Sequence, residues 1–159
     1  MEENALFNVS LKIILKNPEG AVLLLKVPPT SAMAGYCDLP GGRIHSGEEK
    51  EALRNIITRE IREEVGDITY ELNEIPVAVS RHFYISKKTQ KEQNLFWILF
   101  EAKYLEGSIK LSDEHAEYQW IHLTTENVNQ YFTKGALEGM WSYFNKKFAD
   151  SQMMEKIWE

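Results

Sequence analysis

The sequence predicts an α/β domain in which a mixed sheet lies between helices and a long helix closes the chain. Three observations carry this prediction: apolar alternation near the start, a long run of helix formers in the middle, and further strand patterns before a final amphipathic stretch. Strands on both sides of a helix in the sequence favour layered packing. Periodicity by itself does not fix the order of the strands.

Length and composition indicate a single acidic domain. The 159 residues are enough for one sizeable core and too few for two ordinary ones, so residues 1–159 are predicted to form one domain. The formal net charge of −6 argues against binding of duplex nucleic acid. Cys37 is the only cysteine, which excludes an intrachain disulfide. The first ten residues contain no long apolar run, so we expect a cytoplasmic protein without a membrane anchor.

Two strands are predicted at the start of the chain and form a hairpin. Residues 9–16 alternate apolar and polar side chains, as in a strand with one buried face. After a turn at residues 17–20, the apolar run of residues 21–27 is typical of a strand covered on both faces. The loop of residues 28–35 is rich in proline, serine and small residues. It either borders a substrate pocket or is surface padding.

A helix is predicted after the glycine pair Gly41-Gly42, and Gly66 is a typical C-terminal stop for it. At about 100° per residue, the apolar side chains of this helix form one stripe. The members of the stripe are Leu53, Ile57, Ile61 and Val65. This helix is therefore expected to pack one side against the sheet.

Three acids of this helix, Glu60, Glu63 and Glu64, fall on one face at the edge of the apolar stripe. Solvated acids would lie opposite the stripe, where each carboxylate keeps its water. Crowded acids repel one another and raise each other's pKa unless a cation lies between them. A hard divalent ion such as Mg²⁺ accepts oxygen ligands of this kind. The alternative is an ordinary surface helix in which Arg59 and Arg62 form ion pairs with the acids.

Three further strands and two helices are predicted after Gly66. Residues 76–86, 94–104 and 118–123 have strand patterns, and the dense apolar run in the second is typical of a central strand. A short helix precedes the long helix of residues 136–158. The aromatic side chains on the apolar side of the long helix are Trp141, Phe144, Phe148 and Trp158. This stripe is either core or the contact between two chains of a homodimer.

The residues around the central helix resemble the signature of the Nudix (MutT-like) hydrolases. That pattern is Gly, five residues, Glu, seven residues, Arg-Glu, an apolar residue, any residue, Glu-Glu, any residue and Gly. The matching residues here are Gly42, Glu48, Arg59, Glu60, Glu63, Glu64 and Gly66, preceded by Leu39-Pro40-Gly41. Two departures are visible: ten residues separate Glu48 from Arg59, and Asp67 stands where an apolar residue is usual. A register with Glu51 in place of Glu48 puts His45 at the first glycine position and is the worse match.

The resemblance implies an α/β/α sandwich and a hydrolase that acts on a small nucleotide. Such an enzyme cleaves a diphosphate linkage in a nucleoside diphosphate joined to another group, as in a nucleoside triphosphate, a nucleotide sugar or a dinucleotide. The implied cofactor is Mg²⁺, with Mn²⁺ as an alternative. Its implied ligands are Glu60, Glu63, Glu64 and the main-chain carbonyl of Gly41, and Arg59 orients the glutamates.

The resemblance also implies where the general base lies, and the residues themselves offer candidates for substrate contacts. Family members take the base either from a helix glutamate, here Glu63 or Glu64, or from a glutamate on a loop outside the motif. The loop candidates are Glu114, which is preferred, and Glu117, with a solvated acidic loop as the alternative for both. Arg81 and His82 are candidate contacts for a phosphate. The candidates for stacking on a base are Tyr36, Phe83, Tyr84 and Trp97, with ordinary packing as the alternative for each.

Two other functions remain open from the sequence. The first is an RNA cap or end-processing enzyme, which the acidic charge disfavours. The second is a nucleotide-binding regulatory module that has the same fold and no turnover. The intact acids Glu60, Glu63 and Glu64 argue against the module, and the longer spacing before Arg59 leaves it open.

Overall fold

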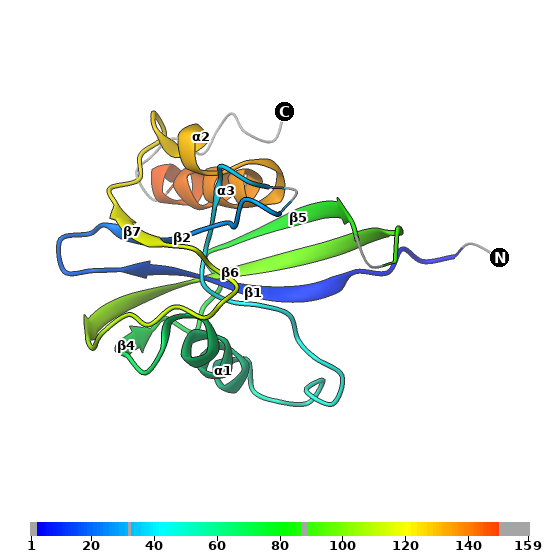
Figure 1. Ribbon diagram of the computed structural model, residues 1–159, viewed down its shortest axis with the longest axis horizontal. Helices are drawn as coiled ribbons and strands as arrows, with labels where there is room; N and C mark the ends of the chain where they lie inside the picture. Colours follow the sequence, from blue (N-terminus) through cyan, green and yellow to red (C-terminus); the bar gives the residue numbers. More distant parts are fainter. Residues whose placement is uncertain (1–2, 32, 87–88, 150–159) are drawn as a thin grey trace.

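The computed structural model confirms the predicted layered architecture. Figure 1 shows α1 (Leu53–Val65) on one side of a twisted sheet, with α2 (Val128–Tyr131) and α3 (Lys134–Ala149) on the other. No helix in the described part of the chain is both long and apolar enough to cross a membrane. The residues that the structure describes are 3–31, 33–86 and 89–149.

Within the described residues the sheet contains seven strands and is mixed. They are β1 (Asn8–Lys16), β2 (Val22–Lys26), β3 (Cys37–Asp38), β4 (Thr69–Leu72), β5 (Ala78–Ile85), β6 (Glu92–Glu106) and β7 (Tyr118–Ile121). The order is β3-β2-β1-β6-β4, with β5 paired to β6 and β7 paired to β2. β1 runs parallel to β6, and the other pairs are antiparallel. The sequence did not predict β3 and β4 because they are too short to show a pattern.

β1 is buried on both faces, so the prediction of one buried face was wrong. Leu11 packs in the cluster that α1 covers, and Ile14 packs in the cluster that α3 covers. Ser10 and Lys12 are buried as well. Polar residues that alternate with apolar ones usually indicate a face in contact with solvent. In β1, however, other parts of the chain cover both faces and bury these polar residues.

α1 brings the acids to the edge of the buried stripe, as predicted. The helix ends at Gly66, whose N–H donates to the carbonyl oxygen of Arg62 at 3.2 Å. Glu60 and Glu64 are only 6% and 8% exposed. Leu53 was predicted on the apolar stripe but is 39% exposed, because it begins the first turn of the helix.

The glycine turn runs along β1 as an additional backbone partner. The N–H of Leu11 donates to the carbonyl oxygen of Gly42 at 2.8 Å, and the N–H of Ile13 donates to that of Pro40 at 2.9 Å. Gly41 has a φ of +119°, and a Cβ there would overlap with the Leu11 carbonyl oxygen. Only glycine fits this position without moving the backbone.

α3 covers the other face of the sheet and confirms the predicted C-terminal helix within the described residues. Its Trp141 and Phe144 pack against the core beneath it. The side chain of Phe148 and the whole of Trp158 lie outside the described residues. The predicted homodimer contact through this helix therefore stays a prediction.

Replacing Gly135 by alanine should destabilise the fold, because α3 approaches β5 closely at this point. A Cβ at Gly135 would lie 2.6 Å from Cβ of His82 and even closer to the main-chain oxygen of Arg81. We expect the free energy of unfolding, measured with a denaturant, to fall by about 1–3 kcal/mol.

Gly139→Ala is the matched control, since it gains the same helix propensity on the same face of α3. A Cβ there would meet side-chain atoms, with Oγ of Ser80 at 3.0 Å, and these can shift. It should lose less stability than Gly135→Ala. Equal stability of the two variants would contradict the close backbone packing.

Candidate active site

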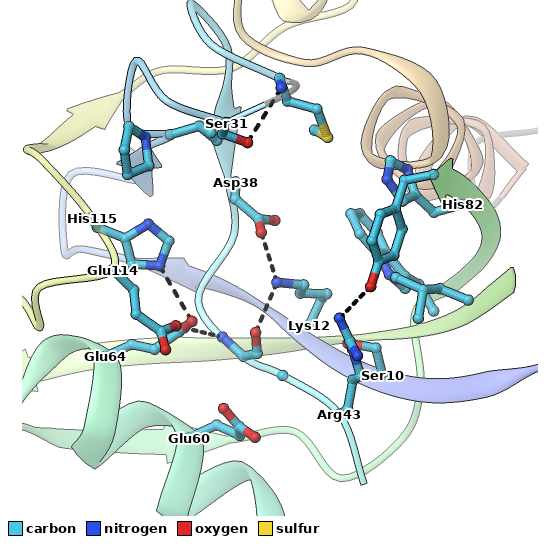
Figure 2. A pocket seen from close by; sticks show the side chains of 18 of the residues that line it. Ser10, Lys12, Ser31, Asp38, Arg43, Glu60, Glu64, His82, Glu114 and His115 are labelled. Atoms are coloured by element: carbon cyan, nitrogen blue, oxygen red, sulfur yellow. Dashed lines mark hydrogen bonds and ion pairs between the residues drawn. The ribbon is translucent and has the colours of Figure 1, made fainter. Parts of the chain in front are cut away.

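A cavity of about 1050 Å³ lies where α1, the glycine turn and strands β1, β5 and β6 meet. This volume is at the upper end of the range for small-molecule sites. The loop of residues 28–35 was predicted to border a pocket, and Pro28, Thr30, Ser31 and Met33 line the cavity. Figure 2 shows side chains from several elements pointing into it. The cavity is large enough for a nucleotide.

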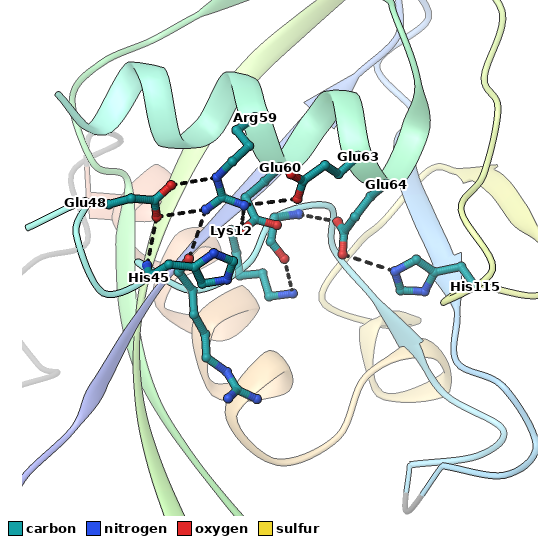
Figure 3. A network of polar contacts seen from close by, with 10 residues as sticks. Lys12, His45, Glu48, Arg59, Glu60, Glu63, Glu64 and His115 are labelled. Carbon is teal, nitrogen blue, oxygen red and sulfur yellow. Dashed lines mark hydrogen bonds and ion pairs between the residues drawn. The ribbon is translucent and has the colours of Figure 1, made fainter. Parts of the chain in front are cut away.

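Arg59 joins the acids of α1 to the loop that precedes the helix (Figure 3). Its Nε and Nη2 donate to the two carboxylate oxygens of Glu48 at 2.7 and 3.0 Å. Its Nη1 donates to Glu60 at 2.8 Å and to Glu63 at 3.0 Å. Burial lowers the pKa of Arg59, but these acids raise it by more, so the guanidinium stays charged. The ten-residue spacing thus leaves Glu48, and not Glu51, in contact with Arg59.

Glu64 connects α1 to the glycine turn and to the loop before β7. Its Oε2 accepts a hydrogen bond from the N–H of Gly41 at 2.6 Å. Its Oε1 lies 3.3 Å from Nε2 of His115. Both carboxylate oxygens are therefore held, which fixes the orientation of this side chain.

Glu60 lies against the glycine turn in a strongly negative environment. A Cβ at Gly42 would overlap with its carboxylate, so the turn can approach Glu60 closely only because this residue is glycine. Burial raises the pKa of Glu60; Arg59 lowers it, and the neighbouring Glu64 and Glu63 raise it further. Burial is the main cause of the raised pKa of Glu60, so its negative charge is costly in this position, and a bound cation would offset part of that cost.

Lys12 brings a buried positive charge into the same cavity (Figure 2). Its ammonium donates to Oδ2 of Asp38 at 2.9 Å, to the Leu39 carbonyl at 3.2 Å and to the Gly41 carbonyl at 2.7 Å. Its Nζ lies 5.3 Å from the ring centre of Trp97. Burial lowers the pKa of Lys12, but the surrounding carboxylates, Asp38 first, raise it above its ordinary value. The sequence analysis missed Lys12, because a lysine in an alternating strand indicates a solvated face.

Aromatic rings from β5 and β6 form another wall of the cavity. His82 stacks on Trp97 with ring centres 5.1 Å apart, and the ring of Tyr84 is 6.2 Å from that of His82. The hydroxyl of Tyr84 accepts a hydrogen bond from Arg43 at 2.7 Å. Burial lowers the pKa of His82. Within the described residues, Nδ1 of His82 and Nε1 of Trp97 are buried without a hydrogen-bond partner.

The substrate contacts predicted at Arg81 and Tyr36 are placed outside this cavity. Among the described residues that line it, neither Arg81 nor Tyr36 is present. Arg81 is exposed on the opposite face of β5 from the buried His82, because successive strand residues point to opposite faces. The structure therefore turns His82 inward, and direct contact of Arg81 or Tyr36 with a ligand in this cavity is not supported.

The loop before β7 contributes Glu114 and His115 to the cavity lining. Glu114 was predicted here as a loop carboxylate, and its position is consistent with that role. His115 was missed, since no histidine spacing in the sequence indicated a site. The one available signal was its place next to Glu114. Glu117 instead pairs with Lys26 at 3.1 Å, and both side chains are exposed.

The acids of α1 suit a hard divalent ion by chemistry, although they do not form a closed metal site. Among the described residues, no three His, Cys, Asp or Glu side chains form a group that could hold an ion. Protein donors engage them instead, with Arg59 on Glu60 and Glu63 and a main-chain N–H on Glu64. Because Mg²⁺ takes few protein ligands and keeps waters and phosphate oxygens, these carboxylates remain the predicted ligands.

The fold is shared with several solved structures. The MutT protein from Methanosarcina mazei Go1 has a TM-score of 0.64 and 24% identity, over 92% of this chain and 96% of that chain. An Ap4A hydrolase from C. elegans has a TM-score of 0.58 and 18% identity, over 91% and 97%. The NUDIX domain of Shewanella oneidensis NrtR, complexed with ADP ribose, has a TM-score of 0.58 and 12% identity, over 94% and 91%. At such identities these similarities show the fold.

The sequence itself supplies the family assignment. No curated protein sequence matches the chain significantly. The family model described as the NUDIX domain matches residues 6–136, which include the glycine turn, α1 and the loop that carries Glu114. The chain therefore belongs to the Nudix hydrolase family, whose members act on nucleoside diphosphates linked to another group.

Proposed function

We propose that the protein is a divalent-metal-dependent pyrophosphohydrolase that cleaves the diphosphate linkage of a nucleoside diphosphate joined to another group. The observation that carries this proposal is that the acids Glu60, Glu63 and Glu64 line one nucleotide-sized cavity beside the glycine turn. Arg59 donates to both carboxylate oxygens of Glu48, a bidentate pair that we call the fork. With its third nitrogen, Arg59 holds Glu60 and Glu63 in place. Nucleoside triphosphates, nucleotide sugars and dinucleotides all belong to this substrate class.

The three acids of α1 are the proposed ligands of Mg²⁺, or of Mn²⁺. When bound, such an ion polarises phosphate oxygens and lowers the pKa of a water. Arg59 keeps Glu60 and Glu63 on the cavity side of the helix, and the side chain of Glu63 remains 57% exposed at its edge. The Gly41 carbonyl is not included among these proposed ligands, because it already accepts a hydrogen bond from Lys12.

Glu114 is the proposed proton acceptor outside α1. It lines the same cavity from the loop before β7, and a carboxylate placed near the attacking water can take its proton. The helix acids Glu63 and Glu64 are the other candidates. His115, which lies next to Glu114 in the chain, holds Glu64 and is proposed to orient it.

The aromatic wall of β5 and β6 supports a substrate with a planar group. Tyr84 and Arg43 lie at the cavity, and the guanidinium carbon of Arg43 is 5.8 Å from the Tyr84 ring centre. Aromatic and guanidinium groups of this kind bind bases and phosphates. ADP ribose, which is bound to the NUDIX domain of NrtR, is itself a nucleoside diphosphate joined to a sugar. This supports the proposed substrate class.

Turnover of a nucleotide panel tests the proposal directly. We expect Mg²⁺-dependent cleavage of at least one nucleoside triphosphate, nucleotide sugar or dinucleotide, measured as phosphate released after phosphatase treatment. Chelation of the metal should abolish this signal. Tight binding of one member of the panel without turnover of any would favour a nucleotide-binding module instead.

The variants Glu63→Gln and Glu64→Gln should remove metal-dependent turnover while the fold is kept. Loss of one negative ligand weakens the stabilisation of charge on the phosphates, so we expect kcat/KM to fall by about a hundredfold or more. Glu71→Gln is the control, because Glu71 is exposed on β4, where it pairs with Lys103. Full activity of both helix variants would remove the assignment of α1 as the catalytic helix.

The variant Glu48→Gln tests whether the fork on Arg59 matters for the metal site. An amide offers one acceptor oxygen where the carboxylate offers two, so Arg59 should hold Glu60 and Glu63 less firmly. We expect metal affinity, measured by calorimetry, to fall by about tenfold. The neighbouring Glu49→Gln should leave metal affinity unchanged, because the carboxylate of Glu49 accepts from the N–H of Gly47 in its own loop, whereas Arg59 donates to Glu48. Equal affinities of the two variants would contradict the role of the fork.

A further inference from the structure

The ammonium of Lys12 lies against an oxygen that the family resemblance gives to a metal ion. Its Nζ donates to the carbonyl oxygen of Gly41 at 2.7 Å, which is shorter than its hydrogen bonds to Asp38 and to the carbonyl of Leu39. An ammonium has three N–H donors, and these three acceptors use all of them. Lys12 is thus fully engaged by the protein.

The position of Lys12 is fixed by its surroundings. The residue is 5% exposed, and β1 is paired with β6 on one side and with the glycine turn on the other. The ring of Trp97 lies on one side of the ammonium and Asp38 on another. Withdrawing Lys12 would leave the carboxylate of Asp38 without its partner in a partly buried place, which is unfavourable.

The backbone of Gly41 is held by a charged side chain at its N–H and by another at its carbonyl oxygen. Its N–H donates to Glu64 of α1, and its carbonyl oxygen accepts from Lys12 of β1. The charge of Lys12 also interacts with Glu60 and Glu64, and both acids stabilise the ammonium. Lys12 therefore does two things that a bound metal ion would do at this place. It orients the carbonyl of Gly41, and it offsets part of the negative charge of Glu60 and Glu64.

A divalent ion on the same carbonyl is hard to reconcile with this arrangement. Two cations that share one carbonyl oxygen lie within about 5 Å of each other and repel, and water screens the charge of Lys12 weakly because this side chain is buried. The carboxylates of α1 fit a metal ion by their chemistry, but the Gly41 carbonyl does not fit, because Lys12 holds it.

We propose that Lys12 replaces a metal ion at the Gly41 carbonyl, so that this protein binds divalent ions through the carboxylates of α1 and not through that carbonyl. The inference rests on the proposed function, because it concerns the same site. Lys12 acts as a positioning residue, since its three donors are used by Asp38, Leu39 and Gly41. It departs from the ligand set that the family resemblance implies.

Metal binding by the variant Lys12→Met tests the inference without any nucleotide. Methionine keeps an unbranched side chain of similar length, removes the charge and frees the Gly41 carbonyl. We expect a titration with Mn²⁺, with free Mn²⁺ followed by electron paramagnetic resonance, to show one additional bound ion or about tenfold tighter binding. A merely structural role of Lys12 would not produce such a gain.

Lys103→Met is the matched control. It removes the same charge from an exposed lysine of β6, whose Nζ is 3.7 Å from Glu71. This variant should bind Mn²⁺ as the wild-type protein does. Unchanged or weaker Mn²⁺ binding by a folded Lys12→Met protein, checked by circular dichroism, would overturn the inference.

A measurement on the unmodified protein decides the question even if Lys12→Met does not fold. In crystals soaked with MnCl₂, we expect anomalous density at Glu60, Glu63 or Glu64, with Lys12 still on the Gly41 carbonyl. An ion within about 2.5 Å of that carbonyl oxygen would overturn the inference. Absence of Mn²⁺ binding from the wild-type protein and from Lys12→Met alike would instead overturn the proposed metal dependence on which the inference rests.

Discussion

The hydrogen bonds of Glu64 and Lys12 to the backbone of Gly41 are the interactions on which the rest of the site depends. Glu64 accepts a hydrogen bond from the N–H of Gly41 and Lys12 donates one to its carbonyl oxygen, so this single residue joins α1 to β1. The apolar stripe of α1 fixes how the helix lies on the sheet, but apolar packing is not directional. The directional hydrogen bond to the N–H of Gly41 defines where Glu64 lies, and those from Arg59 define where Glu60 and Glu63 lie. The peptide can take this place because a side chain at Gly41 would overlap with the carbonyl of Leu11.

Charge compensation explains why the acids can be buried at all. Isolated carboxylates are costly to remove from water, and the raised pKa of Glu60 shows part of this cost. Arg59 lies on α1 beside the acids, where Glu48 of the preceding loop holds it, and Lys12 approaches from the sheet (Figure 3). Neither cation can reach all the carboxylates, and Glu63 stays largely exposed. The carboxylates line the cavity, so their remaining negative charge is available to the divalent ion that is proposed to bind there with the substrate.

The parts of the site that the sequence predicted are local in the chain. Helical periodicity placed Glu60 and Glu64 at the edge of the stripe. The end of the helix could be predicted from Gly66 alone, because glycine directly follows the last helical residue. Lys12 and His115 were missed because their contacts span 29 and 51 residues, to Gly41 and Glu64 respectively. Alternation in a strand shows which residues share a face but not what covers that face. For the same reason the strand pattern could not show that His82, and not Arg81, faces the cavity.

The cavity has two chemically different sides, and Lys12 lies between them. Its Nζ contacts the turn that the acids hold, and it also lies over the ring of Trp97, on which His82 stacks. The proposed chemistry at the diphosphate would therefore use the side of α1, and the proposed recognition of the attached group would use β5 and β6. A metal ion at the Gly41 carbonyl would bring its charge and its waters close to the aromatic wall. A lysine fixed there gives a single charge and brings no exchangeable metal-bound waters beside the ring of Trp97.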